Sequence, residues 1–465
     1  MYDLLSLPGL ANTQWGLNVV RMGFQWHMVE PTAGHYNEEY IQNVVNFVER
    51  LNRHDVHVIL DMHQDCWSPL FCDAHGIPAE YAQGYNSNYK PGGSKAYPEP
   101  VTKPAYDSNG QITNCGDVGK HLPGWATCYI TYAIGAAAQR LYDNDQGILD
   151  RFGMFWQMMA RRVLSYPNVL GYELLNEPWL GDVPLSFEEF LPTNPHWDLW
   201  FPKVSDRKNM AKMYKTLHKY IRKVDNNTII FFEPATGGNL LDAWPVGFDE
   251  GPGGIEYNDR QALSYHVYCP FVDTKKTTNF IQHIIANLSM GACDVLNDAM
   301  YDVRRRDTAK LKIAGFLTEF GNAGSGVAAE DTINFAAKKM DEFLHSWTYW
   351  YLTPDPRDPN STVIQTLARP FAHKIAGVPT EMEFDPKTKK FTLEYLPCSE
   401  TPCANHPTEI YTSKNYTYSG GIEYNTQTLN TVHGYFNDTI QIWYIKVIKI
   451  VPGEPVRVSI TAPKT

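Results

Sequence analysis

Gly171-Tyr-Glu-Leu-Leu-Asn176-Glu177-Pro178 is an apolar, strand-like run that ends in a carboxylate. A second run of the same kind, Ile313-Ala-Gly-Phe-Leu-Thr-Glu319-Phe-Gly321, lies much further along the chain. Burying a carboxylate against leucine or phenylalanine costs free energy, so a residue in such a place usually has a task. We therefore expect both glutamates to lie at the working ends of strands.

Strand-like and helical runs alternate around these two segments, up to about residue 355. The helical runs have apolar residues at helical spacing, as in the stretch that begins near residue 37. The strand-like runs are found at 17–21, 56–63, 171–177, 228–233, 262–268, 313–319 and 346–350. Strands that alternate with helices over this length favour a parallel α/β fold, the (β/α)8 TIM barrel. These are seven strands, whereas a complete barrel of this kind has eight, and we expect the absent strand to be the first.

Two domains are expected. Residues 1–364 form the barrel in this interpretation, with an inserted Cys-rich loop at about 66–144. Residues 365–465 contain short alternating runs divided by Pro, Gly and Asn, which predicts a C-terminal antiparallel β-sandwich. A barrel without its first strand would have an open seam between two edge strands. We therefore expect the chain as written to fold poorly or to be inactive.

Composition excludes some classes of function and indicates a compartment. The 40 basic and 51 acidic residues give a net charge of −11, so a nucleic acid partner is not expected. No apolar run approaches the ~20 residues that span a bilayer. Eight cysteines suggest disulfides and secretion. Glycosylation sequons support this at Asn226, Asn287, Asn360, Asn415 and Asn437. No signal peptide precedes the barrel, so the N-terminus is expected to be incomplete or processed.

Polar or aromatic side chains stand at the expected ends of the strands. They are Arg21, His63, Asp65, Asn176, Glu177, Glu233, His266, Tyr268, Glu319 and Trp350. In a barrel these ends meet at one face. Each residue alone has an ordinary structural explanation, but together they predict an active site. Two converging carboxylates meet the requirement for hydrolysing a glycosidic bond.

The motifs around these residues resemble those of a known family. Asn-Glu-Pro at 176–178, His-x-Tyr at 266–268 and Thr-Glu-Phe-Gly at 318–321 are similar to glycoside hydrolase family 5, in the large clan of retaining barrel glycosidases. The resemblance covers nearly the whole chain. It implies a double-displacement mechanism that needs two glutamates and no metal or other cofactor.

Further motifs resemble the endoglycoceramidases within this family. They are Asp-Met-His-Gln-Asp at 61–65 with the Cys-interrupted loop after it, Phe-Phe-Glu-Pro at 231–234, and Arg369-Pro-Phe at the start of the trailing sandwich. The resemblance implies a secreted endo-β-glycosidase, expected as a monomer, that cleaves glycosphingolipids between oligosaccharide and ceramide. One departure is that the missing first strand supplies a sugar-binding lysine in that pattern.

The resemblance assigns roles to the central residues. Glu177 is the expected acid/base, which protonates the leaving group and then activates water. Glu319 is the expected nucleophile, kept charged by Tyr268 and Arg21. Asn176 is placed to bind the sugar 2-hydroxyl.

The outer residues have less specific expected roles. Trp350 is the expected platform under the sugar at the cleavage point, with Trp347 as its rival. His63 and Asp65 are expected to bind sugar hydroxyls. A metal site is the alternative for these two, but no third ligand is evident in the sequence.

His266 and Glu233 are expected to support the two catalytic glutamates. Glu233 also ends an apolar strand and so competes for the role of nucleophile. In the family pattern the two catalytic carboxylates follow the fourth and seventh strands, which leaves Glu233 as a supporting residue.

The segment after the acid/base also bears on the substrate. Between Trp179 and Phe201 the chain is rich in apolar and aromatic residues and has no Lys or Arg, which suits a lipid leaving group. Residues 66–72 and 123–125 could form the facing wall. A loop that buries its own aromatic residues is an equal alternative, and the resemblance to the endoglycoceramidases favours a glycosphingolipid substrate. A lipid substrate would be taken from a membrane surface or micelle, where the sandwich either helps to bind or only covers the barrel.

Two other functions stay open. One is a β-glucanase or cellulase of the same clan, which would need an open cleft with aromatic platforms on both sides of the bond. The other is a catalytically impaired relative that binds glycolipids.

Overall fold

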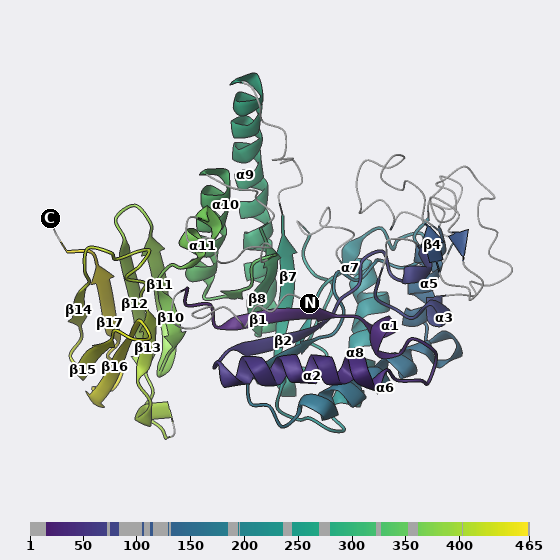
Figure 1. The fold of residues 1–465 in the computed structure, drawn as a ribbon, viewed down its shortest axis with the longest axis horizontal. Helices are drawn as coiled ribbons and strands as arrows, with labels where there is room; N and C mark the ends of the chain where they lie inside the picture. Colours follow the sequence, from purple (N-terminus) through teal and green to yellow (C-terminus); the bar gives the residue numbers. More distant parts are fainter. Residues whose placement is uncertain are drawn as a thin grey trace.

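The computed structural model describes most of the chain. It covers residues 15–71, 75–82, 105–106, 112–114, 129, 132–184, 194, 196–235, 244–268, 280–321, 327–351, 361–401 and 403–463. These residues form a curled sheet wrapped by helices, followed by two smaller antiparallel sheets at one end of the molecule (Figure 1). This is the predicted architecture of an α/β barrel domain with a C-terminal sandwich.

The main sheet has seven strands in the described part of the chain. They are β1 (Val19–Phe24), β2 (His57–Met62), β5 (Val169–Glu173), β6 (Ile229–Phe232), β7 (Gln261–Val267), β8 (Ala314–Phe320) and β9 (Ser346–Trp347). Their spatial order follows the chain, and every neighbouring pair is parallel. The seven predicted strands and their order are therefore confirmed. β1 and β9 are the outermost strands, and no described residue forms a strand between them.

Helices flank the curled sheet above and below in the view of Figure 1. They are α1 (Trp26–Val29), α2 (Glu38–Arg53), α3 (Ala79–Ala82), α5 (Tyr132–Tyr142), α6 (Ile148–Val163), α7 (Pro202–Ser205), α8 (Ala211–Ile221), α9 (Phe280–Leu311), α10 (Val327–Phe343) and α11 (Thr362–Leu367). None of the described helices is both long and apolar enough to cross a membrane. The inserted loop contributes a short antiparallel pair, β3 (Ala105–Tyr106) and β4 (Ile112–Asn114).

Helix α2 illustrates how local sequence produces these elements. Its first turn is capped by Asn37, whose side chain accepts a hydrogen bond of 3.1 Å from the backbone N–H of Tyr40. Glu38 and Glu39 in that turn complement the positive end of the helix dipole. The helix buries one apolar stripe, Ile41, Val44, Val45, Phe47, Val48 and Leu51, against the core.

The C-terminal domain consists of two four-stranded antiparallel sheets. The first has the order β10 (Phe371–Lys374), β13 (Thr408–Tyr411), β16 (Ile442–Lys449), β15 (Thr431–Asn437), and the second has β11 (Gly377–Asp385), β12 (Lys390–Pro397), β17 (Val456–Thr461), β14 (Glu423–Gln427). Alternate residues of the two sheets share one buried apolar core, which includes Phe391, Leu393, Ile410, Ile445 and Val458. The predicted sandwich is confirmed.

The sandwich packs against the starts of the strands rather than against their carboxyl ends. Gly16, just before β1, lies so close to Tyr411 that a Cβ atom there would be 2.4 Å from its ring. His57, at the start of β2, also lies near His373 of the sandwich. Arg369 and Asp341 form a buried ion pair between the domains, and Asp341 also accepts a hydrogen bond from the backbone of the sandwich.

Candidate active site

The predicted site residues meet at the carboxyl ends of the parallel strands. Their positions are Arg21 in β1, His63 and Asp65 after β2, Asn176 and Glu177 after β5, Glu233 after β6, His266 in β7, Tyr268 after β7, Glu319 in β8 and Trp350 after β9. The strand register places residues from distant parts of the sequence side by side, as for the paired His266 and Glu319. The sequence analysis expected Arg21 at the end of its strand, which is wrong, because β1 continues to Phe24 and Arg21 lies within it.

Glu177 and Glu319 face one another across His266. One carboxylate oxygen of each glutamate and a ring nitrogen of His266 all lie within 4.8 Å of one another. Nδ1 of His266 is 2.8 Å from Oε1 of Glu177 and 3.5 Å from Oε2 of Glu319. Both carboxyl groups are buried. Carboxyl groups about 5–5.5 Å apart are typical of glycosidases that retain the configuration of the sugar, whereas inverting enzymes need about 6.5–9.5 Å.

Both carboxylate oxygens of Glu319 accept a hydrogen bond. Arg21 donates from one Nη atom to Oε1 at 2.5 Å, and the hydroxyl of Tyr268 donates to Oε2 at 2.8 Å. Burial raises the pKa of Glu319, while the positive charge of Arg21 opposes this rise. The surrounding carboxylates more than offset the burial of Arg21, so the pKa of its guanidinium rises well above the ordinary value and it stays charged.

Arg21 is also the centre of a group of buried carboxylates, two of which, Glu173 and Asp61, the sequence analysis did not single out. Its Nε atom donates to Glu173, and its second Nη atom lies 3.1 Å from Oδ2 of Asp61 and 3.8 Å from Oε1 of Glu233. Glu173 and Asp61 each lie within an apolar strand-like run. The cost of burying a carboxylate there, which pointed to Glu177, would have indicated both of them.

Glu233 lies behind the acid/base. Its Oε2 atom accepts a hydrogen bond of 3.3 Å from the backbone N–H of Glu177, and its Oε1 atom is 3.4 Å from Nε2 of His266. Burial and the nearby Glu173 raise the pKa of Glu233 well above its ordinary value. Burial lowers the pKa of His266 to about 4. A neutral Glu233 and a neutral His266 are thus the states that this environment favours.

Asn176 is held between Arg21 and the loop after β2. Its Oδ1 atom accepts a hydrogen bond of 2.7 Å from Arg21, and its Nδ2 atom donates to the backbone oxygen of Gln64 at 3.0 Å. Gln64 in turn donates to the backbone oxygens of Asn176 and Glu177, both at 2.8 Å. Gln64 is a positioning residue that the sequence analysis missed. It lies inside the quoted Asp-Met-His-Gln-Asp motif, but nothing in its local sequence indicates its partners.

His63 and Trp350 form one wall of the site. Their rings are stacked, with centroids 5.2 Å apart and an angle of 7° between the planes. Trp347, the rival for the sugar platform, packs edge-on against Phe320 in a separate apolar cluster. The structure therefore brings Trp350, and not Trp347, next to the residues of the site.

Comparison with known proteins agrees with this geometry. The sequence pattern of the cellulase family, glycosyl hydrolase family 5, matches residues 11–356. The glycoside hydrolase family 5 C-terminal domain matches residues 369–460.

The chain belongs to glycoside hydrolase family 5.

Relatives within family 5 cover most of the chain. An endoglycoceramidase of Hydra vulgaris is 32% identical over 422 residues, which span 88% of this chain and 72% of the relative. An endoglycoceramidase of Cyanea nozakii is 31% identical over 437 residues, 88% of this chain and 75% of the relative. Endo-glycoceramidase II from Rhodococcus sp., solved as a lactosyl-enzyme intermediate, shares the fold with a TM-score of 0.72 and 20% identity, over 97% of this chain and 90% of that chain.

As a member of family 5, the protein is a glycoside hydrolase. Glu177 follows β5 and Glu319 lies near the end of β8, and these are the two residues that the sequence analysis matched to the catalytic carboxylates of the family pattern. Glu233 follows β6, and its carboxylate lies beside the backbone N–H of Glu177, the ring of His266 and the guanidinium of Arg21.

The segment proposed for the leaving-group side of this family 5 site is described in part. Trp179 and Val183 are buried, whereas Trp197 and Phe201 are exposed. Residues 185–193, Cys72 and the predicted facing wall at 123–125 lie outside the described residues.

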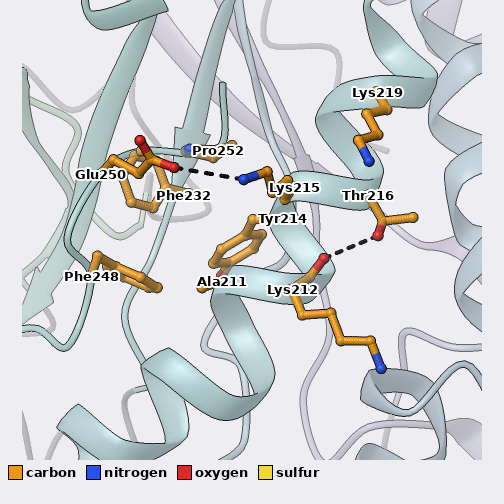
Figure 2. A pocket seen from close by; sticks show the side chains of 11 residues that line it. Ala211, Lys212, Tyr214, Lys215, Thr216, Lys219, Phe232, Phe248, Glu250 and Pro252 are labelled. Atoms are coloured by element: carbon orange, nitrogen blue, oxygen red, sulfur yellow. Dashed lines mark hydrogen bonds and ion pairs between the residues drawn. The ribbon is translucent and has the colours of Figure 1, made fainter. Parts of the chain in front are cut away.

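A separate hollow of about 360 Å³ lies on the outside of the barrel, beside α8 (Figure 2). Its aromatic side chains are Tyr214, Phe232 and Phe248, and Lys215 reaches across to Glu250 at 3.6 Å. None of the predicted site residues lines this hollow, so it is distinct from the site at the strand ends.

Proposed function

We propose that this protein is a retaining endo-β-glycosidase that hydrolyses the bond between the oligosaccharide and the ceramide of glycosphingolipids. The observation that carries the mechanism is the approach of Glu177 and Glu319, whose carboxylate oxygens lie within 4.8 Å with His266 between them. The observation that supports the substrate is the identity of about one third to relatives named endoglycoceramidase.

In the first step an oxygen of Glu319 attacks the anomeric carbon of the sugar. The protonated Glu177 gives its proton to the glycosidic oxygen, so ceramide leaves as an alcohol and a glycosyl ester on Glu319 remains. In the second step the ionised Glu177 takes a proton from water, and the hydroxide attacks the same carbon. The ester bond breaks, Glu319 becomes a carboxylate again, and the two inversions together retain the configuration.

The surroundings match each step. Arg21 and Tyr268 bind the two oxygens of Glu319 and stabilise the carboxylate that attacks and later leaves. Asn176, oriented by Arg21 and Gln64, is placed to bind the sugar 2-hydroxyl. His63, Asp65 and Trp350 supply polar and aromatic contacts for the sugar rings.

The site of action follows from the substrate. A glycosphingolipid would be taken from a membrane surface or micelle, and the exposed rings of Trp197 and Phe201 favour such contact beside the leaving-group segment. We expect a secreted, glycosylated protein that acts as a monomer. The disulfide at Cys66 supports an oxidising compartment, although Cys398 and Cys403 are free thiols.

The experiment that tests this proposal compares lactosylceramide with a soluble β-glucan as substrates, using the natural protein and Glu319→Gln. Release of intact lactose from lactosylceramide, abolished in Glu319→Gln, is the expected result. Turnover of the glucan alone would identify a β-glucanase instead. Binding of the glycolipid without turnover of either substrate would identify a catalytically impaired relative.

A further inference from the structure

Three potential metal ligands converge on the loop after β2. Oδ2 of Asp65 lies 3.1 Å from Nε2 of His75 and 3.5 Å from Nε2 of His63. One ligand atom from each residue lies within 4.8 Å of the others. The sequence analysis considered only His63 and Asp65 and found no third ligand, and the structure adds His75 to this pair.

The two distances from Asp65 suit a small tetrahedral ion. Ligands about 2.0–2.1 Å from Zn²⁺ at tetrahedral angles lie ~3.3 Å from one another. The two distances in the cluster bracket this value. Two imidazoles and one carboxylate are ligands that zinc accepts readily, whereas Mg²⁺ and Ca²⁺ prefer oxygen alone.

The three ligands are also held in place. Asp65 and His75 form two backbone hydrogen bonds with each other, both 3.0 Å long, which fixes their positions across a short bridge. Nδ1 of His63 lies 2.7 Å from Oδ2 of Asp61, a buried carboxylate that Arg21 also contacts. Histidine ligands of metals commonly donate their second N–H to a carboxylate in this way, which orients the ring.

The cluster is open on one side. The side chains of Asp65 and His75 are 27% and 32% exposed, whereas that of His63 is only 7% exposed. An ion held here would therefore have room for water as its fourth ligand. It would also lie on the wall that His63 and Trp350 present to the sugar.

We propose that His63, Asp65 and His75, whose ligand atoms lie within 4.8 Å of one another, bind Zn²⁺, and that the bound ion blocks the sugar-binding wall of the active site. The claim that zinc blocks sugar binding rests on the proposed function, whereas the claim that zinc binds does not. In the complex, Nε2 of both histidines and one oxygen of Asp65 bind the ion, while Nδ1–H of His63 donates to Asp61. The ion and the sugar would then compete for the same side chains.

The binding test needs no activity. Metal-free protein is titrated with ZnCl₂ by calorimetry, and Co²⁺ is used as a visible probe of tetrahedral coordination. One ion per chain is expected. Because loss of a residue that merely supports a ligand costs about 10–100-fold in affinity, loss of a ligand in His75→Ala should cost at least about tenfold. Asp65→Asn, which nearly preserves shape, should weaken binding as well.

The chain offers a matched control. His196 and Asp182 form another partly exposed pair, with Nδ1 and Oδ2 3.3 Å apart, but no metal-binding group of three in the described residues includes them. His196→Ala should leave zinc affinity unchanged. Failure of the natural protein to bind zinc, or equal affinity in His75→Ala, would overturn the proposal. Thermal unfolding of each variant establishes that it is folded.

The inhibition test uses the glycosphingolipid substrate. Zinc should raise KM and leave kcat unchanged, a chelator should restore KM, and His75→Ala should need at least about ten times more zinc for the same effect. A fall in kcat at constant KM would show that the ion acts elsewhere and would refute the blocking role. If the protein turns over no glycosphingolipid, the proposed function fails while the calorimetry still decides whether the zinc site exists.

Discussion

The hydroxyl of Tyr268 donates a hydrogen bond of 2.8 Å to Oε2 of Glu319, while Arg21 binds the other oxygen of the same carboxylate. Since burial raises the pKa of Glu319 above its ordinary value of 4.5, loss of activity on acidification reports protonation of this nucleophile. On acidification, kcat/KM should therefore be half lost at a pH above 4.5, the ordinary pKa of glutamate.

Replacing Tyr268 by Phe should move this acid limb of the pH profile further towards neutral pH, because a donor that favours the charged carboxylate is lost. We also expect kcat/KM at the optimum to drop about 10- to 100-fold, as a hydrogen bond to a charged group contributes about 1.5–3 kcal/mol. The measurement is a pH profile of kcat/KM. Tyr265→Phe is the control, because that hydroxyl contacts His345 instead, and its limb should stay in place. An unchanged limb in Tyr268→Phe would contradict the role given to Tyr268.

The stereochemistry of azide rescue distinguishes the two catalytic glutamates. On an aryl β-lactoside with a good leaving group, Glu177→Ala should lose about 10²–10⁴-fold in the hydrolysis of the covalent intermediate, and azide should restore turnover. The product should be the β-glycosyl azide, because Glu319 still forms the intermediate. Glu319→Ala should instead yield the α-glycosyl azide, since azide then replaces the nucleophile. Exchange of the two products would reverse the assigned roles.

Glu233 should tolerate a neutral substitute. Because its environment raises its pKa and favours the protonated form, Gln can replace it with little change in charge or shape. We expect Glu233→Gln to lower kcat/KM by less than about tenfold, the range of a neutral hydrogen bond. Glu233→Ala should lose more, because the backbone N–H of Glu177 and Nε2 of His266 both lose a neighbour. Abolition of activity in Glu233→Gln, as expected of Glu319→Gln, would make Glu233 the nucleophile.

The buried ion pair between the domains should matter for stability. The side chains of Arg369 and Asp341 are only 4% and 5% exposed, so Arg369→Met leaves an unpaired carboxylate in the interior. We expect a loss of about 3–5 kcal/mol in the free energy of unfolding, measured with urea. The exposed pair of Arg457 and Glu381 is the control, and Arg457→Met should cost less than about 1 kcal/mol. Equal effects in the two variants would contradict the importance of the buried pair.

Much of the fold could be read from local patterns. The seven strands, their helices and the sandwich follow from apolar periodicity, which depends on residues a few positions apart. The same patterns indicated the end of a strand only approximately. Arg21 was expected at the end of its strand but lies within it, because pairing of β1 with β2 continues to Phe24.

The sequence by itself determined which side chains are available for catalysis. Glu177 and Glu319 stand out because a carboxylate at the end of an apolar run is costly wherever the chain folds. Only the tertiary structure decided what those side chains contact. The approach of the two glutamates, the carboxylates around Arg21 and the placing of His75 beside Asp65 all join residues that are separated along the chain. Such contacts depend on how strands pair and loops return in space, and no local sequence pattern contains that information.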